Sequence, residues 1–379
     1  MRDAAGSSVV IAGGGVIGLA VAWRAAVAGL RVSVVDDAPG TGASYAAAGM
    51  LAPVAEAAYG EEGLLQMARA SLDRYPSFVT ELERASGIRV GLRTVGTLVV
   101  GFDEDDLRVI TELAAYQREL GLDPRRLTPR ECRRLEPAVT PRLRGGLHIA
   151  GDHSVDARAL HAALLLAAAR AGAGLVRERV AEVVLADGRA VGVRLGCGRV
   201  VPADTVVVAL GAWSGDLPGV PREVVPVRPV KGQILRLRGE PLISGTVRAL
   251  VRGRPVYLVP YGADRITVGA TMEEMGFDPR VTVGAVRDLL ADATEVVPGL
   301  TELELVETLA RWRPGTPDNA PLIGPTGVPG LVLATGHHRN GVLLAPVTGD
   351  AIAGLLTTGV LPPAAAACAP TRFATEGSP

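Results

Sequence analysis

Hydrophobic and polar positions in the first 40 residues follow first a strand pattern, then a helical one, then a strand pattern again. An apolar run at Val9–Ala12 has the length and composition of a buried strand. The apolar positions of Val16–Ala28 repeat with helical periodicity, and this pattern ends at Gly29. A second apolar run, Val32–Val35, ends at Asp36. The order predicts a strand–helix–strand unit of the kind found in parallel α/β sheets.

The same patterns divide the rest of the chain into further elements. Helical periodicity predicts helices over 64–86 (interrupted near Pro76), 103–120, 127–137, within 154–172, 283–296 and 342–356. Strand-like patterns lie at 90–102, 174–177, 180–185, 190–195, 199–202, 205–209, 230–237, 247–251, 257–260, 265–270, 301–311 and 331–335. The Ala- and Pro-rich stretch 362–379 predicts a loose tail.

This arrangement predicts an α/β fold with two domains, each discontinuous in sequence. A Rossmann-like nucleotide-binding domain takes residues 1–88, 151–225 and 312–379. A second domain, α+β with a mostly antiparallel sheet, takes residues 89–150 and 226–311, because 226–276 is rich in valine and in regularly spaced turns. The second domain is expected to lie over the bound nucleotide.

The glycines between the first strand and helix carry the first candidate chemistry. Gly13, Gly15 and Gly18 have the G-x-G-x-x-G spacing, which suits a tight turn, close backbone approach to a pyrophosphate, and close helix–strand packing. The N-terminus of the following helix presents free N–H groups to phosphates. Asp36, about 20 residues past the glycines, suits a ribose and would repel a 2′-phosphate. Together these features predict a dinucleotide site; a plain Gly-rich turn leaves Asp36 unexplained.

The run Tyr45–Met50 consists mainly of alanine and glycine and allows two interpretations. Small side chains let the backbone approach a flat or bulky group. Alternatively, the run is simply the start of a helix made of good helix formers. The local sequence by itself favours the second interpretation.

Composition narrows the function classes. The 379 residues have a formal net charge of −1 and only 3% aromatic residues, which argues against nucleic acid and anionic membranes as partners. Cys132, Cys197 and Cys368 are odd in number and scattered, and no C-x-x-C occurs, so we expect a reducing cytoplasm and no iron–sulfur or zinc site. The N-terminus does not resemble a signal peptide, and the apolar segment 159–169 is too short to span a bilayer.

Several short motifs in a specific order resemble the D-amino acid oxidase family of flavoproteins, and most closely its members that oxidise glycine for thiamine biosynthesis. The resemblance runs from about Val9 to Leu356. Its motifs are GGGVIG at 13–18, AAAGM at 46–50, GAWSG at 211–215, PVKGQ at 229–233, YLVP at 257–260, VGATM at 268–272, RPGT at 313–316 and GHHRNGVLLAP at 336–346.

The resemblance implies FAD as the cofactor, and the first domain is then an FAD-binding domain. The absence of cysteine near Arg313 or Arg339 leads us to expect non-covalent FAD. A helix after Gly336–Gly341 could direct its N-terminus at the flavin pyrimidine ring. The implied cofactor residues are Gly13, Gly15, Val16, Ile17, Gly18, Asp36, Asp37, Ala43, Ser44, Ala48, Gly49, Met50, Val180, Gly211, His337, His338, Arg339, Asn340, Gly341, Val342 and Leu343.

The resemblance also implies a carboxylate clamp for an amino acid substrate. Arg313 is the candidate guanidinium, which can bind a carboxylate through two parallel hydrogen bonds, and Tyr257 is its hydroxyl partner. Arg339 is a third catalytic candidate, and Met50 and Met272 border the implied pocket. Without the resemblance, each would more simply be a surface arginine, a packed tyrosine or a core methionine.

Two residues depart from the family pattern at the pocket edge. Pro255 stands where a histidine is common, and His338 stands where an aromatic residue is common, so substrate preference stays open. The adjacent His337 and His338 have no acidic or cysteine cluster beside them, and we predict no metal site.

The expected reaction is oxidation of glycine through its imine to glyoxylate, with ammonia and H2O2 as the other products and O2 as oxidant. Arg313 and Tyr257 would hold the carboxylate, and no protein acid or base is required. The alternative is an oxidase or dehydrogenase of sarcosine, D-proline or another D-amino acid. The resemblance suggests a homotetramer; a non-catalytic flavoprotein is disfavoured because it needs no carboxylate clamp.

Overall fold

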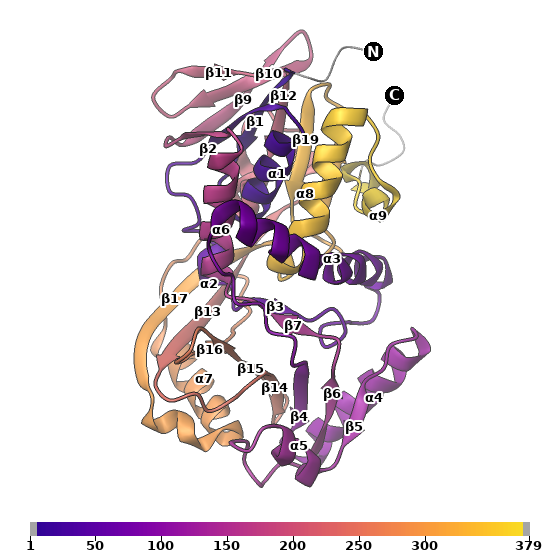
Figure 1. Cartoon of the computed structure of the whole chain (residues 1–379), viewed down its shortest axis with the longest axis vertical. Coiled ribbons are helices and arrows are strands. Elements are labelled where there is room, and N and C mark those ends of the chain that lie inside the picture. The colour runs from indigo at the N-terminus through magenta and orange to yellow at the C-terminus, as the bar shows by residue number, and fades with distance from the viewer. Residues whose placement is uncertain (1–5, 374–379) are drawn as a thin grey trace.

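The computed structural model describes residues 6–373, and its first sheet is the predicted nucleotide-binding one. Six strands lie in the order β18 (Leu322–Pro325), β19 (Leu331–Thr335), β12 (Thr205–Val208), β1 (Ser8–Ala12), β2 (Arg31–Val35) and β8 (Gly174–Val176). All neighbours are parallel except β18, which runs antiparallel to β19. This sheet forms the upper part of the molecule in Figure 1.

Alternating residues of β1 bury opposite faces of this sheet. Val9 and Ile11 pack against helices, whereas Val10 and Ala12 pack on the side of a three-stranded sheet. The helices are α1 (Val16–Val27), α3 (Glu62–Ser86), α6 (Ala157–Arg170) and α8 (Gly341–Thr358). The three strands on the other face are β9 (Val180–Ala186), β10 (Arg189–Leu195) and β11 (Val200–Pro202). Helices and meander therefore sandwich the parallel sheet.

The second sheet has eight strands and lies in the lower part of Figure 1. Its order is β17 (Glu304–Gly315), β13 (Arg228–Arg238), β16 (Arg265–Gly269), β15 (Arg254–Tyr261), β14 (Thr246–Val251), β4 (Thr97–Gly101), β6 (Gly145–Ile149) and β5 (Arg125–Leu127). Only β14 and β4 pair in parallel, and this pairing joins the two predicted inserts in one sheet. Three helices contact this sheet: α4 (Glu104–Glu119), α5 (Pro129–Leu135) and α7 (Val283–Val296).

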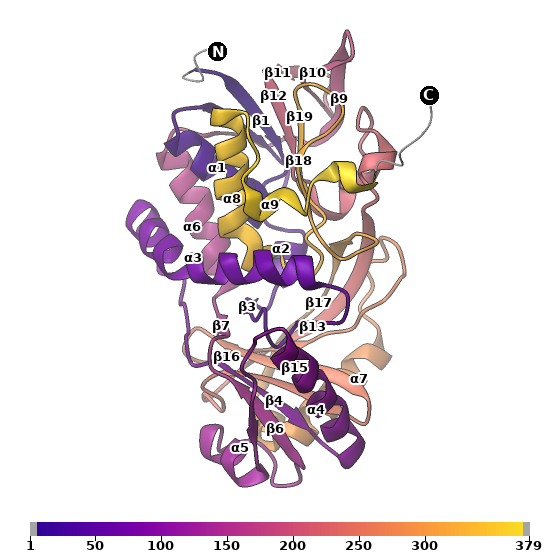
Figure 2. The same ribbon diagram turned by 90° about the vertical axis from the view of Figure 1, so that its right-hand side faces the viewer.

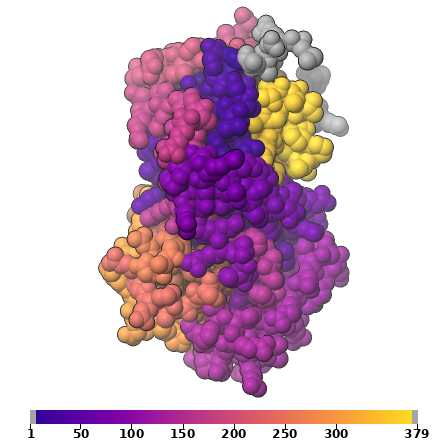
Figure 3. Space-filling view, viewed as in Figure 1, coloured from indigo at the N-terminus to yellow at the C-terminus, as the bar shows by residue number. Residues whose placement is uncertain are grey.

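Short elements lie between the two sheets. The strands β3 (Met50–Leu51) and β7 (His153–Ser154) pair between them, and the four-residue helix α2 (Ala43–Ala46) lies where β13 and β17 approach α6. Figure 2 shows α3 crossing above the lower sheet. In the space-filling view the two parts form one body (Figure 3). We keep the domain boundaries as a prediction; β17 continues through the predicted boundary at 311.

Two local expectations need correction. Helix α3 continues through Pro76 because Tyr75 and Phe78 are fully buried and the Tyr75 hydroxyl donates to the carbonyl of Val342 at 2.9 Å. The expected loose tail is ordered up to residue 373, with short helices at Pro363–Ala366 and Pro370–Phe373 and a buried Cys368 whose carbonyl accepts from Ile323. Residues 374–379 lie outside the described chain. Tertiary contacts that local patterning does not reveal explain both cases.

The run of small residues contains the end of a short helix, not the start of one, and a close backbone approach at Gly49. Residues 43–46 form α2, and Gly49 then has a φ of +86°, where a Cβ would lie 1.8 Å from the carbonyl oxygen of Val155. The close approach at Gly49 is therefore to the chain's own backbone.

Within residues 6–373, one helix is long and apolar enough to cross a membrane, judged by length and composition alone. This is α8, with a mean hydropathy of 1.4. Of its window, 61% is buried in the protein, against α1 and α3 among others. Burial of this kind is typical of a core helix.

Candidate active site

The glycine-rich turn joins β1 to α1 in a conformation that only glycine permits. Gly13 has a φ of +112°, and a Cβ there would lie 2.4 Å from the carbonyl oxygen of Ala209, which directly follows the neighbouring strand β12. A Cβ on Gly18 would lie 2.0 Å from the carbonyl oxygen of Gly13. These contacts account for two of the three glycines by packing of helix and strand.

Gly15, the remaining glycine of the motif, lies at the N-terminus of α1 and leaves space beside it. Gly15 is the N-cap residue and supplies no side chain, and a Cβ there would meet only Ser44 Oγ, at 3.3 Å. Ser44 Oγ accepts from the amide of Val16 at 3.0 Å. Asp36 accepts from the amides of Gly14 at 2.6 Å and Ala38 at 2.8 Å, which places its carboxylate beside the turn. Ser44 therefore caps the first amide of α1, and the further N–H groups of this helix N-terminus suit an anion.

The second glycine-rich turn, Gly336–Gly341, precedes α8 and contains a buried histidine pair. His337 shares a hydrogen bond of 3.0 Å with Thr348, and burial lowers its pKa to about 3. His338 adopts a φ of +44°, and its amide donates to Pro314 at 2.9 Å. Both ring nitrogens of His338 are buried without a hydrogen-bond partner. Burial, reinforced by Arg339 and Arg313, lowers its pKa to about 3, so the ring is neutral and able to accept or donate.

The remaining predicted cofactor residues lie on segments around these two turns. Val180 begins β9 in the same core cluster as Val35, and Gly211 begins a 3₁₀ turn after β12. Asp37 is exposed, next to the half-buried Asp36. Ala43 and Ser44 belong to α2, and Ala48 and Gly49 lie buried just before Met50. Ile17, Val342 and Leu343 are buried in the first turns of α1 and α8. Their role in binding a cofactor stays a prediction.

The two predicted clamp residues converge over a floor of glycine. Arg313 comes from β17, and a Cβ on Gly232 of the adjacent β13 would lie 2.3 Å from its Nη1. Tyr257 comes from β15, and a Cβ on Gly269, its partner on β16, would lie 2.4 Å from its hydroxyl oxygen. Since β13 and β16 are neighbours in the sheet, the two side chains lean toward each other over two residues without side chains.

The electrostatics of the clamp suit a carboxylate. Arg313 is half-buried, yet none of the described residues forms an ion pair with it. Burial raises the pKa of Tyr257, and the charge and hydrogen bond of Arg313 act against that rise. The phenol therefore stays protonated near neutral pH and can donate a hydrogen bond beside an uncompensated guanidinium. Such a pair can bind an anion, and its role as a substrate clamp stays a prediction.

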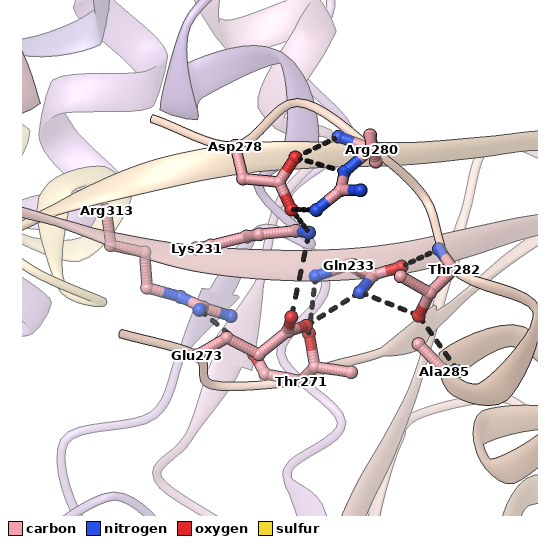
Figure 4. Close-up of polar contacts among 9 residues, drawn as sticks. All are labelled: Lys231, Gln233, Thr271, Glu273, Asp278, Arg280, Thr282, Ala285 and Arg313. Carbon is pink, nitrogen blue, oxygen red and sulfur yellow. Dashed lines mark hydrogen bonds and ion pairs between the residues drawn. The ribbon is translucent and has the colours of Figure 1, made fainter. Parts of the chain in front are cut away.

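Arg313 also contacts the segment that follows β16, whose residues Thr271 and Glu273 belong to a polar network (Figure 4). Its Nη1 donates to the carbonyl of Thr271 at 3.1 Å. The hydroxyl of Thr271 accepts from the amide of Gln233 at 2.8 Å and donates to Glu273 at 2.5 Å. The amide side chain of Gln233 reaches the same Glu273 carboxylate at 2.7 Å. The position of the Arg313 guanidinium thus depends on the backbone around Thr271, which these hydrogen bonds hold in place.

A fully buried lysine anchors the far side of the same segment. Lys231 lies 2.9 Å from Asp278 and 3.6 Å from Glu273, and its side chain has no exposed surface. The hydrogen bonds of Arg280 and then of Lys231 lower the pKa of Asp278. Two carboxylates compensate the buried ammonium, which therefore ties residues 273–278 to β13.

On the other side of the clamp, Met50 and Arg339 meet two residues that the sequence reasoning missed. Glu56 pairs with Arg248 at 2.6 Å and lies 3.9 Å from Arg339. Arg339 also pairs with Glu61 at 2.6 Å, and Arg248 Nη1 lies 3.6 Å from the sulfur of Met50. No local motif marks Glu56 or Arg248; only the pairing of Arg248 with Tyr257 across β14 and β15 brings them here.

Met272, the other methionine predicted at the pocket, lies on the surface. Its side chain is 65% exposed, and it follows Thr271 on the segment that holds Arg313. Its place at the pocket edge stays a prediction.

The residues present fit a flavin dinucleotide. The N-terminus of α1 lies beside Asp36, and a second helix, α8, begins at the turn that carries His338. No described residue forms a hydrogen bond with the buried ring nitrogens of His338, and a ligand can supply that partner. The cysteines lie elsewhere: Cys132 and Cys368 are buried and Cys197 is exposed.

Comparison with known proteins agrees with this fit. The model of the family described as FAD dependent oxidoreductase matches residues 8–355. This chain belongs to that family. The family assignment confirms the resemblance to D-amino acid oxidases, the FAD cofactor and the status of an enzyme; the non-covalent attachment of FAD stays an expectation.

Relatives within the FAD-dependent oxidoreductase family cover most of the chain. The glycine oxidase of Geobacillus kaustophilus is 35% identical over 92% of each chain. The solved structure of glycine oxidase from that organism is 34% identical, with a TM-score of 0.87 over 97% of this chain and 99% of the other. This likeness confirms the predicted fold class. The bifunctional protein ThiO/ThiG of Nostoc sp. is 34% identical over 92% of this chain, which spans only about half (52%) of that relative.

Proposed function

We propose that this chain catalyses FAD-dependent oxidative deamination of glycine, giving glyoxylate through the imine, with ammonia and H2O2. The observation that carries the proposal is the half-buried Arg313, which has no acidic partner within residues 6–373, beside the protonated Tyr257. The glycine oxidases among its relatives support the choice of glycine. The ThiO/ThiG relatives support a role in thiazole formation for thiamine biosynthesis.

The protein's part in this reaction is to bind and orient the substrate. Arg313 and Tyr257 would hold the carboxylate by charge-assisted hydrogen bonds, and this fixes the direction of the Cα–H bond. Bound FAD supplies the acceptor for the hydride and passes the electrons to O2. The neutral His338 adds no positive charge near the substrate amine, which must be unprotonated for the reaction. No acid or base among these residues is required for a step.

The alternative substrates are sarcosine, D-proline and other D-amino acids, with an oxidase or a dehydrogenase as the activity. Pro255 and His338 favour keeping this alternative, because both depart from the family pattern at positions that the resemblance assigns to the pocket edge. A cytoplasmic location and a homotetramer are further parts of the proposal.

Anaerobic visible spectra of the yellow holoprotein test the proposal directly. Bleaching by glycine, with recovery in air, supports a glycine oxidase. Bleaching only by sarcosine or D-proline would retain the clamp and replace the substrate. In Arg313→Met, loss of two charged hydrogen bonds of about 1.5–3 kcal/mol each should lower kcat/KM for glycine by roughly 10²–10⁴-fold. Unchanged glycine affinity in that variant would remove Arg313 from the site.

A further inference from the structure

Three arginines from three different elements converge on the segment 41–47. Arg311 of β17 donates from Nε to the carbonyl of Thr41 at 2.6 Å. Arg158 of α6 and Arg236 of β13 donate to the carbonyl of Tyr45 at 3.2 and 3.1 Å, and Arg236 also reaches the carbonyl of Ala47 at 3.4 Å. Figure 1 shows α2 between the lower end of α6 and the strands β13 and β17. Two strands of the eight-stranded sheet and one helix beside the six-stranded sheet therefore hold this segment.

The segment has little that would hold it by itself. Its helix α2 has four residues, and its N-cap Gly42 makes no side-chain hydrogen bond. A helix this short is not stable without external contacts. The ring of Tyr45 lies 3.5 Å from the guanidinium of Arg158 and 5.8 Å from that of Arg311. The carbonyls at its C-terminal end face cations, as helix polarity favours.

A single carboxylate orients two of the three arginines. Glu307 of β17 lies 2.7 Å from Arg158 Nη2 and 3.7 Å from Arg236 Nε, and it pairs with Arg236 across the two strands. The Arg236 side chain is only 3% exposed. Arg311 forms no ion pair with any described residue, so its hydrogen bond to Thr41 does not depend on Glu307.

We propose that these four residues form an arginine clamp that sets the affinity for FAD by holding residues 41–47 in the binding conformation; its members are Arg158, Arg236, Arg311 and Glu307. They are positioning residues, and the proposal rests on the assignment of Ala43, Ser44 and Ala48 to the cofactor site. Ordering a segment before binding removes that entropic cost from the binding step. Arg311 also lies two residues before Arg313, so one strand serves both the cofactor segment and the substrate.

The test measures the FAD dissociation constant by titrating apoprotein and following flavin fluorescence, together with the melting temperature of the apoprotein. Glu307→Gln and Arg311→Met should each weaken FAD binding at least tenfold, and Arg311→Lys should recover part of it. If Glu307→Gln fails to fold, Arg311→Met carries the test, because Arg311 is half-buried and free of ion pairs.

The same two strands offer a matched control. Glu304 pairs with Arg238 at 2.6 Å across β17 and β13, but this pair is exposed and makes no hydrogen bond to 41–47. Glu304→Gln should therefore change FAD affinity less than twofold. If Glu304→Gln loses as much FAD affinity as the arginine clamp variants, the proposal is overturned. The loss would then follow from removing any ion pair between β17 and β13, whether or not it contacts residues 41–47.

The variant Ser44→Ala distinguishes failure of the arginine clamp proposal from failure of the assignment of residues 41–47 to the cofactor site. If Ser44→Ala weakens FAD binding while the clamp variants bind like wild type, the clamp is wrong and the cofactor segment stands. If Ser44→Ala and the clamp variants all bind FAD like wild type, the assignment of 41–47 to the cofactor fails and the clamp proposal fails with it.

Discussion

Replacement of Gly232 by alanine should disable the substrate clamp while leaving the fold nearly intact. The new Cβ would lie 2.3 Å from Arg313 Nη1, 2.6 Å from its Cζ and 2.7 Å from its Nη2. Favourable carbon contacts begin at about 3.5 Å, so the guanidinium must move by roughly 1 Å. The atoms that clash are the far end of a flexible side chain, and the backbone of β13 need not shift.

A displacement of this size should cost little stability and much catalysis. Misplacement of a binding group by about 1 Å can cost about 10²-fold in rate. We therefore expect kcat/KM for glycine to fall roughly 10²-fold in Gly232→Ala, while the free energy of unfolding changes by less than about 1 kcal/mol. Binding of acetate, a carboxylate without an amine, should weaken in parallel.

The measurements are steady-state kinetics, acetate titration of the flavin spectrum and urea denaturation. Gly284→Ala is the matched control, since a Cβ there meets no atom within 4 Å and the residue lies in α7, away from the clamp. Retention of kcat/KM within twofold in Gly232→Ala would refute the view that a glycine floor positions Arg313. Equal losses in Gly284→Ala would attribute the effect to glycine replacement in general.

Three other changes test separate parts of the structure. Tyr257→Phe should lower kcat/KM for glycine about tenfold, the value of one hydrogen bond, and steady-state kinetics that match wild type would exclude the hydroxyl from the clamp. Burial raises the pKa of Asp152 to about 7, so the folded protein keeps a proton that the unfolded chain releases, and stability falls as pH rises from about 4 to 7. Asp152→Asn should lack this dependence, and urea denaturation should show wild type losing up to about 4 kcal/mol relative to the variant across that window; parallel pH profiles would contradict the raised pKa of this buried carboxyl. Gly49→Ala should destabilise the protein by at least about 2 kcal/mol, because its φ is +86° and its Cβ would meet the Val155 carbonyl; an unchanged denaturation midpoint would mean that the backbone yields there.

Patterning along the chain predicted the elements whose contacts are mostly local. The strand, glycine turn and helix at residues 9–27 appear where the spacing places them. Pro76 and the stretch after 362 were misjudged because burial of Tyr75 and Cys368 comes from segments far away in sequence. Propensity describes a segment by itself, and distant packing overrides it.

The sequence by itself determined the glycine-rich turn after β1 and, through its motifs, the family and the cofactor, and it predicted the clamp pair Arg313 and Tyr257. Only the tertiary structure decided what surrounds that pair: the glycines beneath it, the network of Lys231 and the pairing of Glu56 with Arg248. The physical reason is register. Which side chains meet across β17, β13, β16, β15 and β14 depends on strand pairing over long sequence separations, and no local pattern encodes that pairing.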